Sequence, residues 1–170
     1  MRKILLTAAA AATLFAAIPA TAAQAATTTA GRGSSTVESV VGVGTLGQFG
    51  SPTAYLAAIG NQRGQLGAFT ITYPDGTYVI GTSSCLAIDG TTAYVTGKVA
   101  LSGGPRRDAN NWQRGNYMVV GVQDNGDGTV EPDKLNFSPG SATDPGCGPN
   151  LIARPDFFIV KGNYRVTDAG

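Results

Sequence analysis

From about residue 38 onward, apolar and polar side chains alternate along the chain, and this alternation predicts β-strands. It is clearest at 68–73, AFTITY, where Phe69, Ile71 and Tyr73 share one face. The PDG sequence at 74–76 that follows is a strong turn signal. A strand that ends in such a turn is the first half of a predicted antiparallel hairpin.

The next two segments continue the pattern and are joined by the DGTT turn at 89–92. In 77–89 the residues expected to share one face are Tyr78, Ile80, Leu86 and Ile88. In 93–101 they are Ala93, Val95, Val99 and Leu101. Because short turns connect 68–73, 77–89 and 93–101, we expect the three segments to form an antiparallel meander.

Five more segments have strand character. The stretch 116–123 places Met118, Val120 and Val122 in phase, and short strands follow at 134–137 and 157–168. Gly162 indicates a bulge in the last of these, because the apolar phase does not continue through it. Upstream, 38–47 and 52–60 are also predicted strands, although Ala and Leu in the second are compatible with one helical turn.

No long helical period follows the N-terminal segment, and the 24 glycines suit many tight turns. Seven or eight strands at short spacing therefore predict an all-β fold, an antiparallel meander that forms a sandwich or a small flattened barrel. The alternation is the same in both architectures and does not choose between them. We expect one domain at 38–170.

The N-terminus has the pattern of a secretory signal peptide. Arg2 and Lys3 precede an apolar stretch, and Ala23-Gln24-Ala25 has the small-x-small cleavage pattern. We therefore expect a signal peptide at 1–25, a flexible leader at 26–37 and a secreted product. A membrane anchor is the alternative, but the apolar segment is short for a span and has no basic flank after it.

Cysteine content and charge narrow the picture further. In an exported protein, Cys85 and Cys147 are expected to form a disulfide, with two reduced thiols as the alternative. After cleavage at residue 25 the balance is 10 basic against 11 acidic residues, a net charge of −1. A near-neutral chain without a basic cluster suggests neither nucleic acid nor, after signal cleavage, a membrane as partner.

Three stretches also resemble a known group of proteins. The cysteine-bearing segment 64–99, the Asp124-Asn125-Gly126 hairpin and the closing strand Gly162 to Asp168 resemble small secreted β-domains of high-GC Gram-positive bacteria. The resemblance covers roughly residues 40 to 170. It implies the fold and an extracellular location, and it adds no activity or site residue, because that group has no assigned activity.

The available chemistry is limited by the absence of histidine. This excludes Ser-His-Asp and Cys-His catalysis and every histidine-ligated metal site. Paired carboxylates would still permit glycoside hydrolysis, but the acidic residues fall mostly at turns, where they usually form local hydrogen bonds. We therefore predict that the protein is not an enzyme and needs no cofactor.

The segment 123–133, QDNGDGTVEPD, resembles a calcium-binding loop. Asn125, Asp127 and Gly128 fit positions three, five and six of an EF-hand loop, but Gln123 and Lys134 fall where its two strongest ligands belong. Asn-Gly and Asp-Gly also supply the positive φ angles that a hairpin turn needs. We predict no metal site here, and the sequence leaves open a weak calcium site between Asp124 and Asp133.

The second candidate is the loop at 102–115, which contains the only tryptophan. Trp112, with Arg107, Asn111 and Arg114 around it, has the composition of a surface that stacks on and hydrogen-bonds a sugar or a peptide. One aromatic residue among polar neighbours is also a common loop composition, and we expect instead that Trp112 folds back as a plug over the barrel end. The leading functional hypothesis is a secreted, non-catalytic β-domain with a structural or extracellular interaction role. Its alternative is a small-ligand or carbohydrate-binding domain that uses this loop or a barrel-end cavity.

Overall fold

The computed structural model describes residues 37–61, 64–127, 131–150 and 152–169. The predicted signal peptide, and all of the predicted leader except Val37, lie outside the described residues. The described residues contain no helix that is long and apolar enough to cross a membrane.

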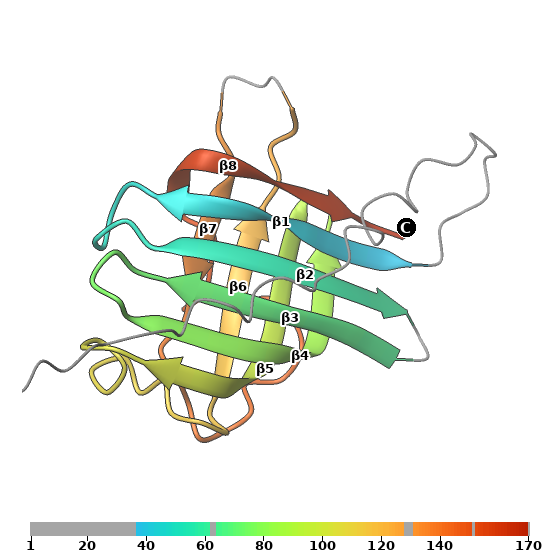
Figure 1. The fold of residues 1–170 in the computed structure, drawn as a ribbon. Coiled ribbons are helices and arrows are strands. Elements are labelled where there is room, and N and C mark those ends of the chain that lie inside the picture. Colours follow the sequence, from blue (N-terminus) through green and yellow to red (C-terminus); the bar gives the residue numbers. More distant parts are fainter. Residues whose placement is uncertain (1–36, 62–63, 128–130, 151, 170) are drawn as a thin grey trace, which may run out of the picture. The chain divides into compact units, whose positions relative to one another are not determined.

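Eight antiparallel strands form a closed barrel (Figure 1). They are β1 (Glu38–Leu46), β2 (Thr53–Asn61), β3 (Gly64–Thr72), β4 (Tyr78–Asp89), β5 (Thr92–Gly103), β6 (Tyr117–Gln123), β7 (Lys134–Phe137) and β8 (Phe157–Thr167). Each strand pairs with the next in sequence, and β8 pairs with β1. The all-β meander is thus confirmed, and the fold is a barrel and not a sandwich.

Large aromatic side chains fill the barrel interior, and glycines on nearby strands of the sheet make room for them. The Phe69 ring lies where a Cβ on Gly81 would come within 2.1 Å of it, and one on Gly97 within 2.8 Å. The Tyr164 ring lies in the same way against Gly42 and Gly44, where a Cβ on either glycine would come within 2.6 Å of it. Aliphatic side chains of every strand complete this core. The strand glycines therefore serve close packing as well as turns.

Two predicted faces are wrong in part, because bulges change the phase within single strands. Ser84 has no partner in the β4–β5 register, so Tyr78 and Ile80 before it point outward while Leu86 after it points into the core. Ala100 is skipped in the same way on β5, and Leu101 is consequently 53% exposed. One inserted residue reverses the side on which every following side chain lies.

The predicted bulge in the last strand is also present, two residues from the expected place. The register with β1 skips Val160, whereas Gly162 pairs with Gly44. Gly162 has φ of +106°, and a Cβ there would lie 2.1 Å from the Val43 carbonyl oxygen. The glycine is required at that position by its backbone angle and by the close approach of β1.

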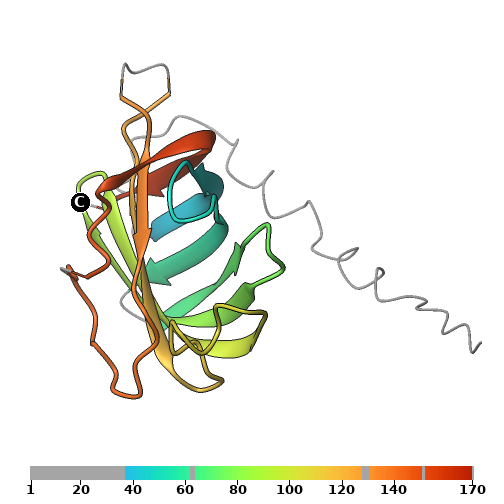
Figure 2. The same ribbon diagram turned by 90° about the vertical axis from the view of Figure 1, so that its left-hand side faces the viewer.

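The long loop at 138–156 covers the outer side of β5 and β6 (Figure 2 shows the barrel from one end). It buries Tyr94 and Val119 against Ala153. The predicted disulfide between Cys85 and Cys147 is confirmed, with 5.6 Å between the two Cα atoms, and it fixes this loop to β4. One part of the outer barrel surface is therefore covered by the chain itself.

Candidate functional site

Trp112 closes one end of the barrel. Its side chain is 1% exposed and packs against the rings of Tyr73 and Phe137, with centroids 5.9 and 6.0 Å away. Its indole N–H donates to the Ser138 carbonyl oxygen at 3.5 Å, and the Ser102 hydroxyl donates to the Trp112 carbonyl oxygen. Trp112 is therefore the plug that we expected, and it offers no exposed surface on which a sugar or a peptide could stack.

Arg106 holds the loop that carries Trp112 in place. Its guanidinium donates to the Asp75 carboxylate at 2.5 Å and to the Phe49 carbonyl oxygen at 3.1 Å, and it lies 4.7 Å from the centroid of the Tyr73 ring. The hydrogen bond from Arg106, together with the backbone N–H of Thr77, lowers the pKa of Asp75 to about 2. Arg106 therefore joins three turns at the barrel end.

The other predicted contact residues of this loop are not gathered into a site. Arg107 is exposed and pairs with its neighbour Asp108 at 2.8 Å. Asn111 adopts φ of +54° and donates its side-chain amide to the Gly140 carbonyl oxygen, which ties two loops together. Arg114 is exposed. With Trp112 buried, these side chains share no aromatic platform, and the loop loses the feature that suggested ligand binding.

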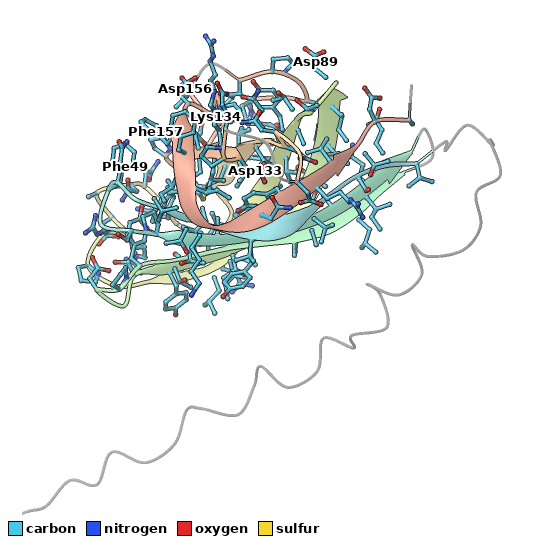
Figure 3. All side chains as sticks on the ribbon, turned by 90° about the horizontal axis from the view of Figure 1, so that it is seen from above. Phe49, Asp89, Asp133, Lys134, Asp156 and Phe157 are labelled. Atoms are coloured by element: carbon cyan, nitrogen blue, oxygen red, sulfur yellow. A yellow bond between two sulfur atoms is a disulfide. The ribbon has the colours of Figure 1, made fainter. Side chains whose placement is uncertain are left out.

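The described part of the calcium-like segment lies where β7 and β8 meet, and we call this junction the seam. These two strands share only two register pairs, whereas β8 and β1 share eight. Farther along β8, past these two pairs, the Asp133 carboxylate takes the place of a strand partner. It is 3% exposed and accepts the backbone N–H of Tyr164 at 2.7 Å and that of Asn125 at 2.9 Å. Asp124 accepts the N–H of Val166 at 2.9 Å. The two carboxylates replace the missing strand partner of β8, and Asp133 lies beside β8 in Figure 3.

A hollow of about 320 Å³ lies between this segment and β8. Three carboxylates, those of Asp127, Glu131 and Asp133, are among its lining residues. Asp133 is bound to backbone N–H groups, and Asp127 accepts the side-chain amide of Asn163 at 2.8 Å. Within the described ranges, no three His, Cys, Asp or Glu side chains are grouped so that they could hold a metal ion. The described carboxylates of this segment hold β8 in place through hydrogen bonds from N–H groups.

An apolar surface that the described residues leave uncovered lies on the side of the barrel formed by β1, β2, β3, the start of β4 and the end of β5. We call it the outer face, and it is turned toward the viewer in Figure 1. Its apolar side chains are Val41, Val43, Tyr55, Ala57, Ile59, Leu66, Ala68, Ile80 and Leu101. Its polar ones are Ser39, Thr45, Thr53, Thr70, Thr72, Tyr78 and Thr82. Leu66 is 80% exposed and Tyr55 53%.

Basic side chains border the outer face on two sides. Lys98 on β5 pairs in register with Thr82, and Arg165 and Lys161 on β8 pair with Val41 and Thr45. All three basic residues are exposed. Lys98 also lies 4.8 Å from the centroid of the Tyr117 ring, and its hydrogen bond with Tyr117 raises its pKa. Each basic edge also has a carboxylate near it, because Asp127 accepts the side-chain amide of Asn163 on β8 and Asp144 acts on Lys98.

The alternation of residue types does not identify the outer face. In β2 both faces are largely apolar, so alternation cannot tell which side is buried. Alternation assigns Ile80 and Leu101 to the core, and the bulges turn them outward. The available signal is the run AYLAAI at 54–59, which is more apolar than a strand exposed on one side requires.

Comparisons with protein-family models, curated proteins and solved structures gave no match to this chain.

Proposed function

We propose that this chain is a secreted, non-catalytic β-domain that binds a protein partner through its outer face. The observation that carries the proposal is an unequal covering of the barrel. The loop at 138–156 buries Tyr94 and Val119 on the outside of β5 and β6, whereas Leu66 and Tyr55 on the other side are exposed to water. An exposed apolar patch with polar edges is typical of an interaction surface.

The size of the outer face fits the centre of a protein interface. Five strands about 4.8 Å apart and four outward rows about 6.8 Å apart give a patch of roughly 400 Å². A standard interface buries about 800 Å² on each partner, with an apolar core and a polar rim. The apolar rows would supply that core, and the threonines and basic residues around them the rim.

The interior of the barrel favours this role over ligand binding. Phe69, Tyr164 and the aliphatic core occupy the space between the strands, and Trp112 plugs one end. A ligand-binding barrel needs an apolar cavity with a few directed polar groups. In the described residues, side chains occupy the space where such a cavity would lie. The outside of the barrel is therefore the better candidate surface.

Secretion is part of the proposal and has two supports. The first 25 residues have the charge, apolar stretch and cleavage pattern of a signal peptide. The bond between Cys85 and Cys147 is of a kind that persists in oxidising compartments.

Site-specific crosslinking tests the proposal. A photoreactive benzoylphenylalanine replaces Tyr55 on the outer face or, as a control, Ile152, which is 67% exposed in the loop at 138–156. Irradiation in medium and lysate of the native host should give a discrete adduct from position 55 and none from position 152.

The captured protein is then purified and its binding measured. Tyr55→Asp should weaken binding at least about 30-fold, because the interface would bury an uncompensated carboxylate. Ile152→Asp should leave the Kd within about twofold. Failure to crosslink at position 55, or equal crosslinking at both positions, would refute the proposed function.

A further inference from the structure

We infer that the partner is a second copy of this chain, and that two copies pack outer face to outer face about a two-fold axis. This inference rests on the proposed function and names the partner. It follows from three properties of the outer face on β1, β2 and β3: its lack of charge, its apolar area and its order of large and small side chains.

The part of the outer face on these three neighbouring strands carries no charge. Four rows run across the strands in register, and every outward side chain in them is aliphatic, tyrosine, serine or threonine. Homodimer interfaces are more apolar than other protein interfaces, and interface cores are depleted of charged residues. Two identical faces of this kind meet without like charges opposed, and neither needs a partner of opposite charge.

The apolar area of the outer face is close to what a two-fold interface needs. Leu66 is 80% exposed, Ile59 56%, Val41 54% and Tyr55 53%. A standard interface buries about 800 Å² on each partner, and about 65% of a homodimer interface is apolar. The patch of roughly 400 Å² formed by the outward rows therefore supplies most of the apolar part, and the threonines around it supply the polar part.

A large side chain lies directly beside small ones on this face. Tyr55 is two residues from Ala57 on β2, and Ala68 pairs with Ala57 on β3. Both alanines are exposed. Outward neighbours on one strand are about 6.8 Å apart, so a protruding row adjoins a low row at the distance of one pleat repeat. Such a surface is complementary to a copy of itself that is shifted by one row.

A two-fold axis across the strands produces that shift. Copies that pack face to face are related by an axis in the plane of the interface. An axis between the Tyr55 row and the Ala57 row places Tyr55 of each copy over Ala57 of the other, with the sheets about 10 Å apart. Ile59 then lies over Thr53 of the other copy. An axis along the strands would instead place alanine over alanine and leave a gap, so the first arrangement is the one inferred.

A lipid surface fits this face less well than a second copy. The hydroxyl groups of Thr45 and Thr53 lie 2.9 Å apart, and insertion into acyl chains would remove them from water without new partners. In the dimer, the row that contains these threonines lies at the edge of the interface, where water reaches it. The basic residues beside the face also have carboxylates of this chain near them, which weakens attraction to anionic lipids.

Photocrosslinking at position 55 identifies the occupant. The benzoylphenylalanine variant should give an adduct of twice the protomer mass, and mass spectrometry should map the attachment to the β2 segment around Ala57 of the second copy. Sedimentation velocity of the purified protein should show dimers at about 10 µM, because interfaces of standard size have Kd values that are micromolar or tighter.

Paired charge variants test the two-fold contact. Ala57→Asp and Tyr55→Lys should each raise the dimer Kd at least about 10-fold, because each homodimer would bury two unpaired charges. An equimolar mixture should form heterodimers at least about 10-fold more tightly than either variant forms homodimers, since the mixed dimer has one pair of opposite charges and one native contact. Ala142→Asp, an exposed position in the loop at 138–156, is the control and should leave the Kd within about twofold. Thermal melts establish that each variant is folded.

Each other outcome overturns the inference and identifies where it fails. An adduct with a different protein would leave the proposed function standing and make that protein the partner. A dimer adduct that maps outside the outer face, or a mixture that does not restore association, would reject the two-fold contact. A wild-type protein that stays monomeric at about 100 µM would reject the dimer. Binding to phosphatidylglycerol vesicles that Tyr55→Asp abolishes would make a lipid the occupant. If no adduct forms at position 55, the proposed function fails and the inference fails with it.

Discussion

Replacing Asp133 by alanine should open the barrel at the β7–β8 seam. The Asp133 carboxylate is 3% exposed and accepts two backbone N–H groups, those of Tyr164 on β8 and Asn125 in the preceding loop, at 2.7 and 2.9 Å. The Tyr164 amide is buried and has no strand partner on that side, because β7 pairs only with Phe157 and Phe158. Asp133→Ala therefore leaves a buried donor without an acceptor.

The magnitude follows from these two bonds. A hydrogen bond to a charged group contributes about 1.5 to 3 kcal/mol, and water can reach the Asn125 amide more easily than the Tyr164 amide. We expect Asp133→Ala to lower the free energy of unfolding by about 3 to 5 kcal/mol. Asp133→Asn retains one acceptor oxygen and should lose about half as much. For a domain of about 130 residues, 3 kcal/mol corresponds to roughly 10 °C in Tm.

Urea unfolding and amide hydrogen exchange measure the effect. Exchange should accelerate first at Tyr164 and Asn125 and only later at the β1–β2 ladder. The control is Asp156→Ala, whose exposed carboxylate pairs with Arg154 at 3.3 Å and should contribute less than about 1 kcal/mol (Figure 3 labels both aspartates). A loss below 1 kcal/mol for Asp133→Ala, or uniform acceleration of exchange, would refute the idea that this carboxylate holds the seam.

Four further outcomes are expected. Trp112→Ala should destabilise the protein by about 3 to 5 kcal/mol, as for other buried large aromatic residues, and wild-type Trp112 fluorescence should resist acrylamide quenching; strong quenching would contradict its burial. The pKa of Asp75 is lowered to about 2, so its pairing with Arg106 stabilises the fold above the ordinary value of 3.8 and is lost as pH falls toward 2. The unfolding curves of wild type and Asp75→Asn should accordingly converge near pH 2, and an unchanged difference there would be evidence against the pairing. Replacing Cys85 and Cys147 by serine removes a cross-link over 62 positions and should destabilise the oxidised protein by about 4 kcal/mol; identical denaturation midpoints would contradict this. Millimolar calcium should not shift Tm, because the seam carboxylates already accept N–H groups; a shift of several degrees that a chelator reverses would show a metal site.

The sequence by itself predicts the elements because their signals are local. Alternation and turn chemistry identify the strands, and the inward positions Phe69 and Ile71 on β3 and Met118 and Val120 on β6 are confirmed. A meander also follows from short turns, since neighbouring segments then pair with each other. The disulfide is predicted from two cysteines and from the N-terminal pattern that predicts export.

The tertiary structure decided everything that depends on a partner strand. Ser84 and Ala100 are bulged because of how β4 and β5 pair, and no local pattern shows which residue a register will skip. These bulges place Ile80 and Leu101 outside and so help to create the outer face. Alternation alone assigns both to the core.

Long-range contacts also determined the fate of the two candidate motifs. Trp112 is buried because Tyr73 and Phe137, distant in sequence, meet at the same barrel end. The calcium-like segment holds β8 because β7 is too short to pair with it along its length. Sequence alternation tells which side chains share a side of one strand. Only closure of the barrel decides which side is filled, which is covered by a loop, and which is left exposed.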